Sequence, residues 1–420
     1  MKYLDKLKNT HFIGFPDIDW SSVFVRDSIL IECEEFYDGK NIFIDIVRPF
    51  VSRDYKFIFK ENEGANILIV SEQDRKSIQK QISEISELAK MDVAHIKEEK
   101  QLTFHPWLGL KILCMIPFWV FSVIKARLNM VESRSCINNL IILFLFKSLN
   151  KIVLNKYHLL ISYYDSLIIE SYLTALFKHN NITTCTLQHA QFNSWRENKF
   201  INSGVEFRSS CSDYYIAWNQ FSLDEAKKDG CNVKNYIKAG IIGYVGTEYK
   251  ECSYPNNGVF GIALAHPFFE AESLKMIEAA NLLAEKRHLK YYLKLHPNYE
   301  EHYFDDKVNK TYYLGNIKKG IPMLEYANMV DFTIVGSSSV FIEMLYLRHN
   351  VIRYSTKSIS DKFKDINLGS VYSKVDDVVD VYDKGFNKEE DEKLFEYLCY
   401  TKDCTKEYQR IIKKLSDDKC

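Results

Sequence analysis

The chain has 420 residues, enough for two domains of about 200 residues each. It is 46% hydrophobic and 26% charged, which excludes a disordered chain or a fibre. The 55 Lys and Arg residues balance the 56 Asp and Glu residues, so a partner bound through overall charge, such as bulk nucleic acid, is also excluded. The ten cysteines are scattered without C-x₂-C spacing, and the first 20 residues lack the apolar segment of a secretory signal. We therefore expect a cytoplasmic protein with free thiols.

The first half of the chain predicts an α/β domain. Runs rich in β-branched and aromatic residues, typical of strands, alternate with segments whose apolar residues recur at helical spacing. We expect strands at 41–47, 55–60, 65–71, 158–166, 182–190 and 236–242, and a strand followed by a helix within 212–231. We expect helices at 73–100 and 167–181, the first of them exposed and amphipathic.

Two apolar runs interrupt this alternation, at 107–124 and 137–154. Each contains Lys, Pro or Asn and falls short of the roughly 20 uninterrupted apolar residues that cross a bilayer. One interpretation is a pair of buried helices in the first domain. A second is a helical pair that inserts into a membrane surface, with basic side chains facing the lipid headgroups, and a third is a transmembrane hairpin. These basic side chains are Lys111, Lys125, Arg127, Lys147 and Lys151.

The second half predicts another α/β domain. Residues 245–258 cluster Pro, Gly and Asn and mark a linker, so the domains are expected to cover residues 1–245 and 246–420. We expect strands at 259–265, 290–296, 331–336 and 351–355, and helices at 269–288, 320–328, 339–350 and 388–418. Strands that alternate with helices of this length are typical of parallel, doubly wound sheets. We therefore expect two α/β domains facing a cleft, with the ligand between them.

The segment 331–347 carries the strongest local motif. A buried strand ends at Gly336, the serines Ser337, Ser338 and Ser339 turn the corner, and a helix follows. Hydroxyls and backbone N–H groups at a helix N-terminus can bind phosphate, and Glu343, one turn further on, could bind ribose hydroxyls. The alternative is plain helix capping by serine, with Glu343 exposed.

Two His-Pro pairs also follow predicted strands of this second sheet. His296 and Pro297 stand directly after the strand at 290–296, and His266 ends the strand at 259–265. Ligands of parallel sheets bind at the carboxyl ends of the strands, and an imidazole there can bind a phosphate or donate a proton to a leaving group. A structural role is the alternative for a single histidine. The convergence of two His-Pro ends with the serine turn favours a binding site.

Two strand ends of the first domain are candidates for a general base. Asp165 follows the strand at 158–166, with Glu170 about a turn into the next helix, and His189 with Gln188 follows the strand at 182–190. A carboxylate or imidazole at such an end can deprotonate an acceptor hydroxyl. The alternative for Asp165 is an N-cap of the following helix.

Several well-known motifs are missing. The sequence lacks G-x-x-x-x-G-K-[ST] and G-x-G-x-x-G, which argues against P-loop and dinucleotide enzymes, and it lacks G-x-S-x-G and H-E-x-x-H. Asp17 and Asp19 could hold a divalent ion together with a sugar nucleotide, but they precede every phosphate-binding strand–helix unit. We therefore expect no metal.

Taken in order, these segments resemble the bacterial cell-surface glycosyltransferases of the GT-B class, which have two Rossmann-like domains. The group includes bacterial sialyltransferases, capsule Kdo transferases and, more distantly, CDP-glycerol glycerophosphotransferases. The resemblance covers roughly residues 155–355 and rests on YYDSLIIES, LQHAQF, the passage from SDYYIAW to YIKAGIIG, LKLHP and GSSSVFIEMLYL.

The resemblance implies roles for individual residues. The sialyltransferases use a His-Pro and a Ser-Ser motif for the CMP-activated donor, and these correspond to His296-Pro297 and Ser337–Ser339. Their acidic motif supplies the general base; Asp165 is the nearest counterpart, without the second acid and the Gly usual there. LQHAQF is similar to the Gln-His-Gly turn of related transferases, with Ala190 in place of Gly.

The expected function is therefore a metal-independent glycosyltransferase that acts on a nucleotide-sugar donor. The first-choice donor is a CMP-activated sialic-acid-like or Kdo-like sugar. The resemblance and the hydropathy together imply a glycan or lipid-linked glycan acceptor at the cytoplasmic membrane surface, and no nucleic acid. The alternatives are a CDP-polyol phosphotransferase of teichoic-acid-like polymers and an inactive glycan-binding subunit with the same fold.

Overall fold

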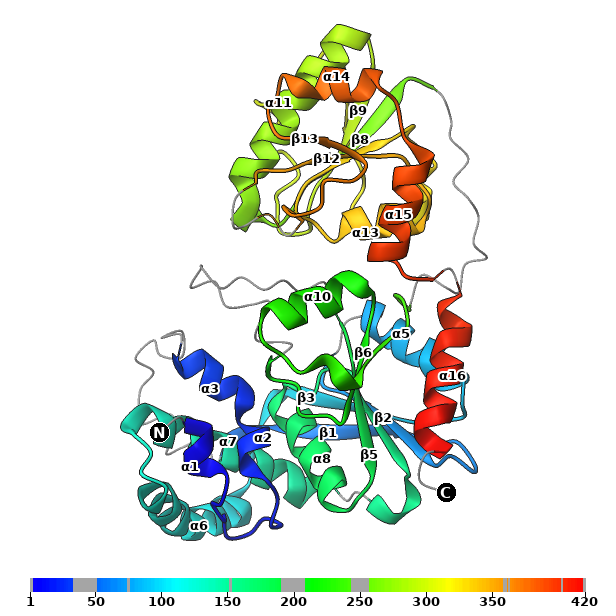
Figure 1. Ribbon diagram of the computed structural model, residues 1–420. Coiled ribbons are helices and arrows are strands. Elements are labelled where there is room, and N and C mark those ends of the chain that lie inside the picture. The colour runs from blue at the N-terminus through cyan, green and yellow to red at the C-terminus, as the bar shows by residue number, and fades with distance from the viewer. Residues whose placement is uncertain are drawn as a thin grey trace. The chain divides into compact units, whose positions relative to one another are not determined.

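The computed structural model describes residues 3–32, 51–73, 76–150, 153–189, 208–242, 257–357, 361, 363–401 and 403–417 (Figure 1). The expected strand at 41–47, Ala190 and nearly all of the expected linker lie outside the described residues. The chain divides into two compact units. Unit 1 comprises Met1–Ala217, Ser222–Tyr244 and Asp403–Cys420, and unit 2 comprises Trp218–Phe221 and Val245–Lys402.

Unit 1 is built on a seven-stranded sheet with the order β1-β3-β2-β4-β5-β6-β7. All neighbours pair in parallel except β1, which pairs with β3 antiparallel at the edge. The strands are β1 (Val51–Lys60), β2 (Ile67–Ser71), β3 (Asp92–Phe104), β4 (Leu159–Ser162), β5 (Thr183–Leu187), β6 (Tyr214–Ala217) and β7 (Tyr236–Lys238). Every residue of β2, β4 and β5 is buried, as expected for strands covered on both faces.

Helices cover this sheet. They are α1 (Tyr3–Leu7), α2 (Trp20–Val23), α3 (Val25–Glu32), α5 (Lys76–Glu87), α6 (Pro106–Lys125), α7 (Met130–Leu149), η1 (Leu154–Lys156), α8 (Ile168–His179), α10 (Gln220–Lys228), η2 (Val233–Asn235) and α16 (Cys404–Asp417). The main hydrophobic core contains residues of α1, α2, α6, α7 and α8 and of the neighbouring strands. Trp20 and Trp119 belong to this core, and both are fully buried.

Unit 2 is built on a six-stranded parallel sheet with the order β10-β9-β8-β11-β12-β13. The strands are β8 (Val259–Ala263), β9 (Lys290–Lys294), β10 (Tyr313–Asn316), β11 (Thr333–Val335), β12 (Val351–Tyr354) and β13 (Ser370–Tyr372). The helices are η3 (Pro267–Phe269), α11 (Glu270–Arg287), α12 (Met323–Ala327), α13 (Val340–Tyr346), α14 (Asp377–Asp383) and α15 (Lys388–Leu398). The α11 and α14 helices contact each other, as do α13 and α15 (Figure 1).

Three expectations from the sequence were wrong in detail. The amphipathic helix expected at 73–100 ends at Glu87, and residues 92–104 form the strand β3. The helix expected at 388–418 is two helices, α15 and α16, because Tyr400 adopts a left-handed backbone conformation between them (φ 69°). The second of these helices belongs to unit 1 and not to the C-terminal unit.

Candidate functional site

In unit 2, the order of the strands reverses between β8 and β11. The chain proceeds from β8 to β9 and β10 on one side, then returns to place β11, β12 and β13 on the other. Ligands of open parallel sheets bind outside the carboxyl ends of the strands at such a reversal. His266 follows β8 and the turn Gly336–Ser339 follows β11, so both of these predicted segments flank this point. His296 follows β9, the next strand in the sheet.

The structure brings the two predicted histidines together. The ring centroids of His266 and His296 lie 4.9 Å apart at an interplanar angle of 72°, and both residues are partly exposed. Asn298 contacts both rings: its side chain lies 2.9 Å from Nε2 of His266, and its backbone N–H donates to Nδ1 of His296. Partial burial, together with the neighbouring His266, lowers the pKa of His296, which favours its neutral form at pH 7.

Both His-Pro segments use the same local hydrogen bond. The backbone N–H two residues after each histidine donates to its Nδ1, from Phe268 to His266 and from Asn298 to His296, each over 3.2 Å. Because Nδ1 accepts, the proton of the neutral ring must reside on Nε2. Nε2 of His296 is therefore a hydrogen-bond donor, and it has no hydrogen-bond partner among the described residues. Pro297 itself is exposed.

The serine turn differs from the expectation at its first two positions. Ser337 is buried, and its hydroxyl donates to the carboxylate of Glu272 over 2.8 Å. A Cβ on Gly336 would lie 1.8 Å from Oε1 of Glu272, so this position needs a glycine to admit the carboxylate. Gly336 and Ser337 thus hold the turn onto α11 and do not present groups to a phosphate.

The later residues of the turn remain accessible. Ser338 is partly buried, and its hydroxyl accepts the backbone N–H of Val340, the first residue of α13, over 3.3 Å. Ser339 is exposed. Glu343 is partly buried on α13 and interacts electrostatically with Lys294, whose pKa is lowered by its own burial. Ser339 and Glu343 are therefore the segment's polar groups that remain candidates for a ligand.

A buried polar network lies beneath the turn, and the sequence analysis did not identify it. Asp361 accepts from the hydroxyl of Ser337 over 3.3 Å and lies 3.6 Å from the guanidinium of Arg353. Asp361 and Arg353 are 2% and 1% exposed, respectively, and Glu272 is 4% exposed. Glu272 stands in the first turn of α11, where an acid is common for helix stability alone, so nothing in the sequence distinguished it.

Unit 1 has its own reversal of strand order, between β2 and β4. Glu72 follows β2, and Glu170 lies in the first turn of α8 after β4. The backbone N–H of each of these residues donates to the carboxylate of the other over 2.8 Å, and the N–H of Tyr164 also donates to Glu170. Burial raises the pKa of both carboxyls, and for Glu170 the neighbouring Glu72 raises it further. One proton is therefore favoured within the pair near neutral pH.

His189 lies beside Tyr164, whose backbone N–H donates to Glu170. It follows β5 by two residues and is partly buried, and its ring centroid is 4.0 Å from that of Tyr164 and 6.1 Å from that of Tyr163. The guanidinium of Arg26 lies 5.6 Å from the centroid of the Tyr164 ring. His189 thus belongs to the carboxyl edge of the unit 1 sheet, as the sequence predicted.

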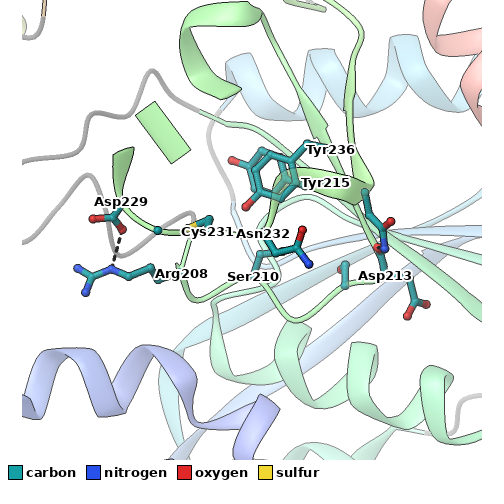
Figure 2. A pocket seen from close by; sticks show the side chains of 11 residues that line it. Arg208, Ser210, Asp213, Tyr215, Asp229, Cys231, Asn232 and Tyr236 are labelled. Carbon is teal, nitrogen blue, oxygen red and sulfur yellow. Dashed lines mark hydrogen bonds and ion pairs between the residues drawn. The ribbon is translucent and has the colours of Figure 1, made fainter. Parts of the chain in front are cut away.

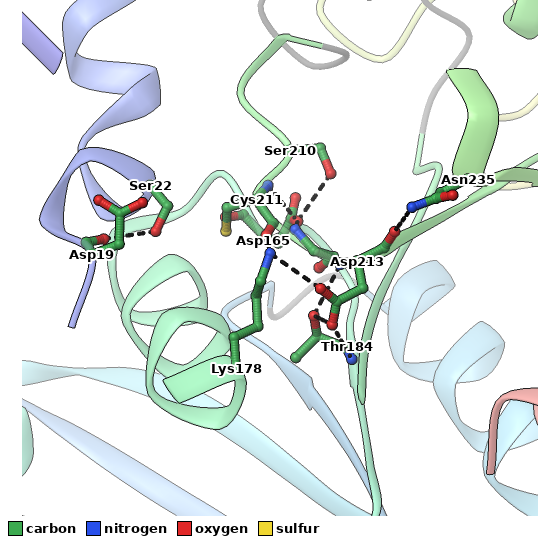
Figure 3. A network of polar contacts seen from close by, with 10 residues as sticks. Asp19, Ser22, Asp165, Lys178, Thr184, Ser210, Cys211, Asp213 and Asn235 are labelled. Atoms are coloured by element: carbon green, nitrogen blue, oxygen red, sulfur yellow. Dashed lines mark hydrogen bonds and ion pairs between the residues drawn. The ribbon is translucent and has the colours of Figure 1, made fainter. Parts of the chain in front are cut away.

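Asp165 has a different environment from the one that a general base needs. It is 1% exposed, and its Oδ2 accepts hydrogen bonds from the backbone N–H groups of Cys211 and Ser212 and from the hydroxyl of Ser210 (Figure 3). Burial nevertheless raises its pKa. The N-cap of α8 is Leu167, so Asp165 does not cap that helix either. Asp165 instead holds the segment before β6 in place.

A cavity of about 390 Å³ lies at the opposite edge of this sheet (Figure 2). Tyr215 and Tyr236 stack there with their ring centroids 4.6 Å apart, and Arg208 pairs with Asp229 at 2.8 Å. These residues belong to the amino-terminal ends of β6 and β7 and to the segments before them. Ser210 and Ser212 line this cavity and also donate to Asp165, so the cavity adjoins the segment that the buried Asp165 holds in place.

Comparison of the sequence finds no matching protein family and no matching curated protein. Comparison of the structure does find similar folds. A protein assigned as a UDP-N-acetylglucosamine 2-epimerase from Listeria monocytogenes matches with a TM-score of 0.52 and 11% identity, over 84% of this chain and 97% of that chain. MnaA from S. aureus, solved with UDP, matches with a TM-score of 0.50 and 10% identity, over 84% and 96% of the two chains. The wall teichoic acid polymerase TagF, solved with CDPG, gives 0.44 and 10% identity, over 85% and 90%.

The first two likenesses and the two parallel-rich sheets define the fold. The chain has the GT-B type of fold, with two Rossmann-like units, which confirms the fold class expected from the sequence. At identities of 10–11%, similarity is a matter of backbone topology. The chemistry must therefore be argued from this chain's own side chains.

Proposed function

We propose that this protein is a glycosyltransferase that moves a sugar from a nucleotide-activated donor to a bacterial cell-surface glycan. The observation that carries the proposal is the histidine pair at the reversal of strand order in unit 2. Two His-Pro segments there place neighbouring imidazoles at the carboxyl edge of a parallel sheet. The hydrogen bond to Nδ1 of His296 directs the N–H of its Nε2 to an outside acceptor, as binding of a phosphate oxygen requires.

Unit 2 would bind the donor. His296 would donate to the phosphate of the leaving nucleotide, and His266 with Asn298 would position the His296 ring. Ser339 and Glu343 would bind phosphate and ribose hydroxyls, respectively. A fixed N–H donor stabilises the charge that develops on the leaving phosphate, so we propose that transfer needs no metal. Chelation with EDTA is then expected to leave the rate unchanged.

Unit 1 would activate the acceptor. Of the two bases expected from the sequence, His189 is partly exposed, whereas Asp165 is buried with Oδ2 engaged in three hydrogen bonds. A base must reach the proton that it removes, which favours His189.

The first-choice donor is a CMP-activated sialic-acid-like or Kdo-like sugar, and the proposed acceptor is a capsule or other surface glycan at the cytoplasmic face of the membrane. This choice rests on the resemblance of the His-Pro and serine segments to those of the sialyltransferases. A CDP-polyol phosphotransferase would use the same phosphate-binding edge but transfer phosphate to its product.

A second candidate function is the 2-epimerisation of a UDP-sugar. The two solved structures that share the fold favour it, since one was assigned as a UDP-N-acetylglucosamine 2-epimerase and the other was solved with UDP. Glu72, which is partly exposed beside the buried Glu170, could act as acid or base in such a reaction. An epimerase needs no acceptor, so formation of an isomeric UDP-sugar in the absence of any glycan would identify it.

The test is a thermal-shift series with CMP, CDP, UDP, GDP and dTDP. We expect CMP to raise the melting temperature of the wild type and to have no effect on His296→Ala. His302→Ala is the matched control, because His302 is exposed in the same unit and, among the described residues, its side chain is paired only with Asp305. Stabilisation by CDP would instead favour the polyol phosphotransferase, and UDP an ordinary hexosyl transfer or the epimerase. A folded protein that responds to none of the five would contradict the proposal and favour the glycan-binding subunit.

The assignment of the base has a separate test. We expect His189→Ala to keep the wild-type melting temperature and to lose roughly 100-fold or more in kcat. His158→Ala, an exposed histidine of the same unit, should lose nothing. Asp165→Ala should lower the free energy of unfolding by about 3 kcal/mol, because its three donors would be left buried. An Asp165→Asn variant with wild-type stability and no activity would make Asp165 the base.

A further inference from the structure

The α6 helix is apolar on all sides, yet one of its faces is exposed. Among the helices of the described residues, α6 alone is long and apolar enough to cross a bilayer. Only 22% of its most apolar 18-residue stretch is buried. Trp107, Phe121 and Ile124 are 78%, 67% and 66% exposed, respectively. The exposed residues recur at intervals of three and four and form one stripe, called here the α6 face: Trp107, Leu110, Cys114, Phe118, Phe121 and Ile124. Soluble helices normally turn such a stripe inward.

The opposite face of α6 is packed into unit 1. Ile112 and Trp119 are fully buried, and Nε1 of Trp119 donates to the carbonyl of Ile13 over 2.9 Å. The Trp119 ring also contacts Phe15 and Phe144, with centroids 6.0 and 5.9 Å away. A helix held in this way can lie on a bilayer but cannot cross it without leaving the core. The neighbouring apolar helix α7 has its central residues buried, so only α6 of the pair expected from sequence offers a membrane-facing surface.

The charges carried by the α6 helix itself have one sign. The helix contains no Asp or Glu, and Lys111, Lys125 and Arg127 are exposed without an ion pair among the described residues. A groove of about 510 Å³ at its C-terminal end joins apolar walls from Phe118 and Phe121 to Lys125 and Arg127. Asp5 also lines the groove, while Lys6 is neutralised by Glu132 at 2.7 Å. Exposed aromatic and aliphatic side chains bordered by unpaired cations match the interface of a bilayer that contains anionic lipids.

We propose that the α6 face docks unit 1 in the plane of an anionic membrane surface, with its apolar side chains among the headgroups and upper acyl chains. A second copy of this chain is the competing occupant. Two α6 faces would bring Lys111, Lys125 and Arg127 of both copies together without a carboxylate on either helix, which disfavours self-association. The proposal is independent of the proposed reaction, since it concerns binding alone.

The first test is sedimentation of the full chain with phosphatidylcholine vesicles, with and without phosphatidylglycerol. We expect binding to the anionic vesicles, and a loss of at least roughly tenfold in affinity for Phe121→Ser combined with Ile124→Ser. The matched control combines Ile58→Ser with Leu314→Ser, which removes two other exposed apolar side chains, 51% and 40% exposed. The control should bind as the wild type does.

The second test addresses charge. Lys125→Glu combined with Arg127→Glu should weaken binding to anionic vesicles by at least roughly tenfold, because each cation near such a surface contributes about a fivefold factor. Lys286→Glu combined with Lys384→Glu, two exposed lysines of unit 2, is the control for the change in net charge. The difference between the variants should disappear at high salt.

Trp107 gives a local readout. Its emission should shift to the blue with anionic vesicles and be quenched by lipids brominated near the headgroup, and Trp107→Phe should abolish both effects. Wild-type protein that does not sediment with anionic vesicles would overturn the proposal, as would unaltered binding by the Phe121→Ser, Ile124→Ser variant. So would a wild-type dimer in lipid-free solution that this variant converts to a monomer, because the α6 face would then be covered by a second copy.

Discussion

At residue 336 the space normally taken by a side chain is occupied by another residue's carboxylate. Glu272 reaches from α11 to the turn after β11 and accepts both the backbone N–H and the hydroxyl of Ser337. It is almost completely buried, with Arg353 as an electrostatic partner. A buried carboxylate is tolerated only when hydrogen bonds and opposite charge compensate its lost hydration. The turn that carries Ser338 and Ser339 is therefore fixed from below.

The close approach of Glu272 to Gly336 predicts how a methyl group added at position 336 affects stability. Gly336→Ala should lower the free energy of unfolding by about 2 kcal/mol, or roughly 5 °C in melting temperature, because its Cβ would lie 1.8 Å from Oε1 of Glu272. In a Glu272→Ala background the same change should cost less than about 0.5 kcal/mol, since the obstructing carboxylate is gone. Equal losses in the two backgrounds, measured by thermal unfolding, would show that the carboxylate is not the cause.

The acid pair of unit 1 predicts a dependence on pH. The pKa of Glu72 is raised by burial from its usual 4.5, so the folded state holds a proton that the unfolded chain releases. This proton stabilises the fold at low pH, and the stabilisation is lost as the pH rises through the raised pKa. Glu72→Gln keeps an acceptor for the N–H of Glu170 and removes one charge.

We therefore expect Glu72→Gln to be more stable than the wild type at pH 8, by about 1–3 kcal/mol, with a smaller difference at pH 5. The measurement is thermal unfolding at both values. Glu63→Gln, an exposed residue of the turn between β1 and β2, controls for the loss of one carboxylate and should show no such trend. A difference for Glu72→Gln that is the same at both pH values would refute the shared proton.

Among the elements, those set by local pattern were predictable and those set by pairing were not. The α11 helix and the strands β8, β9 and β12 lie within one or two residues of their predicted bounds, because alternation and helical periodicity are local signals. The β3 strand was not predicted, since its sequence DVAHIKEEKQLTF carries charges that suit an exposed helix. Pairing with β1 over nearly its whole length, and with β2 at its start, overrides that local preference.

The two apolar segments show the same limit. By composition they are alike, but the central residues of α7 are buried while α6 presents an exposed stripe. Hydropathy measures how apolar a helix is, but it does not show which segments of the folded chain will cover that helix. At the candidate site, His266, His296 and His189 could be found because each follows a strand by two or three residues. Glu272, Glu72 and the true partners of Asp165 depend on contacts between distant segments, from 45 to 98 residues apart in these cases.

On the scale of the whole molecule, the last described helix belongs to the first unit. The helix α16 belongs to unit 1, although all of unit 2 precedes it in the chain. Its buried residues are Tyr408, Ile411, Ile412 and Leu415. Ile411→Ala combined with Leu415→Ala should therefore destabilise unit 1 by about 4 kcal/mol or more. Lys413→Ala combined with Lys414→Ala, the exposed neighbours, is the control.

Amide hydrogen exchange identifies which unit is affected. The variant of the buried residues should lose protection in β4 and β5 and keep it in β8 and β11. Faster exchange confined to the unit 2 strands would contradict the assignment of α16 to unit 1.

The position of α16 also sets an order of events during synthesis. The ribosome makes the strands of unit 1 first, then about 160 residues of unit 2, and only afterwards the helix that covers unit 1. At about 5–20 residues per second, unit 1 waits roughly 10–30 s for α16, and the sequence of unit 2 is complete roughly 1–3 s before that of α16. The later-made unit can therefore mature before the earlier one. A chain released before residue 404 would carry an incomplete unit 1, a state that cellular quality control can recognise by its exposed apolar surface.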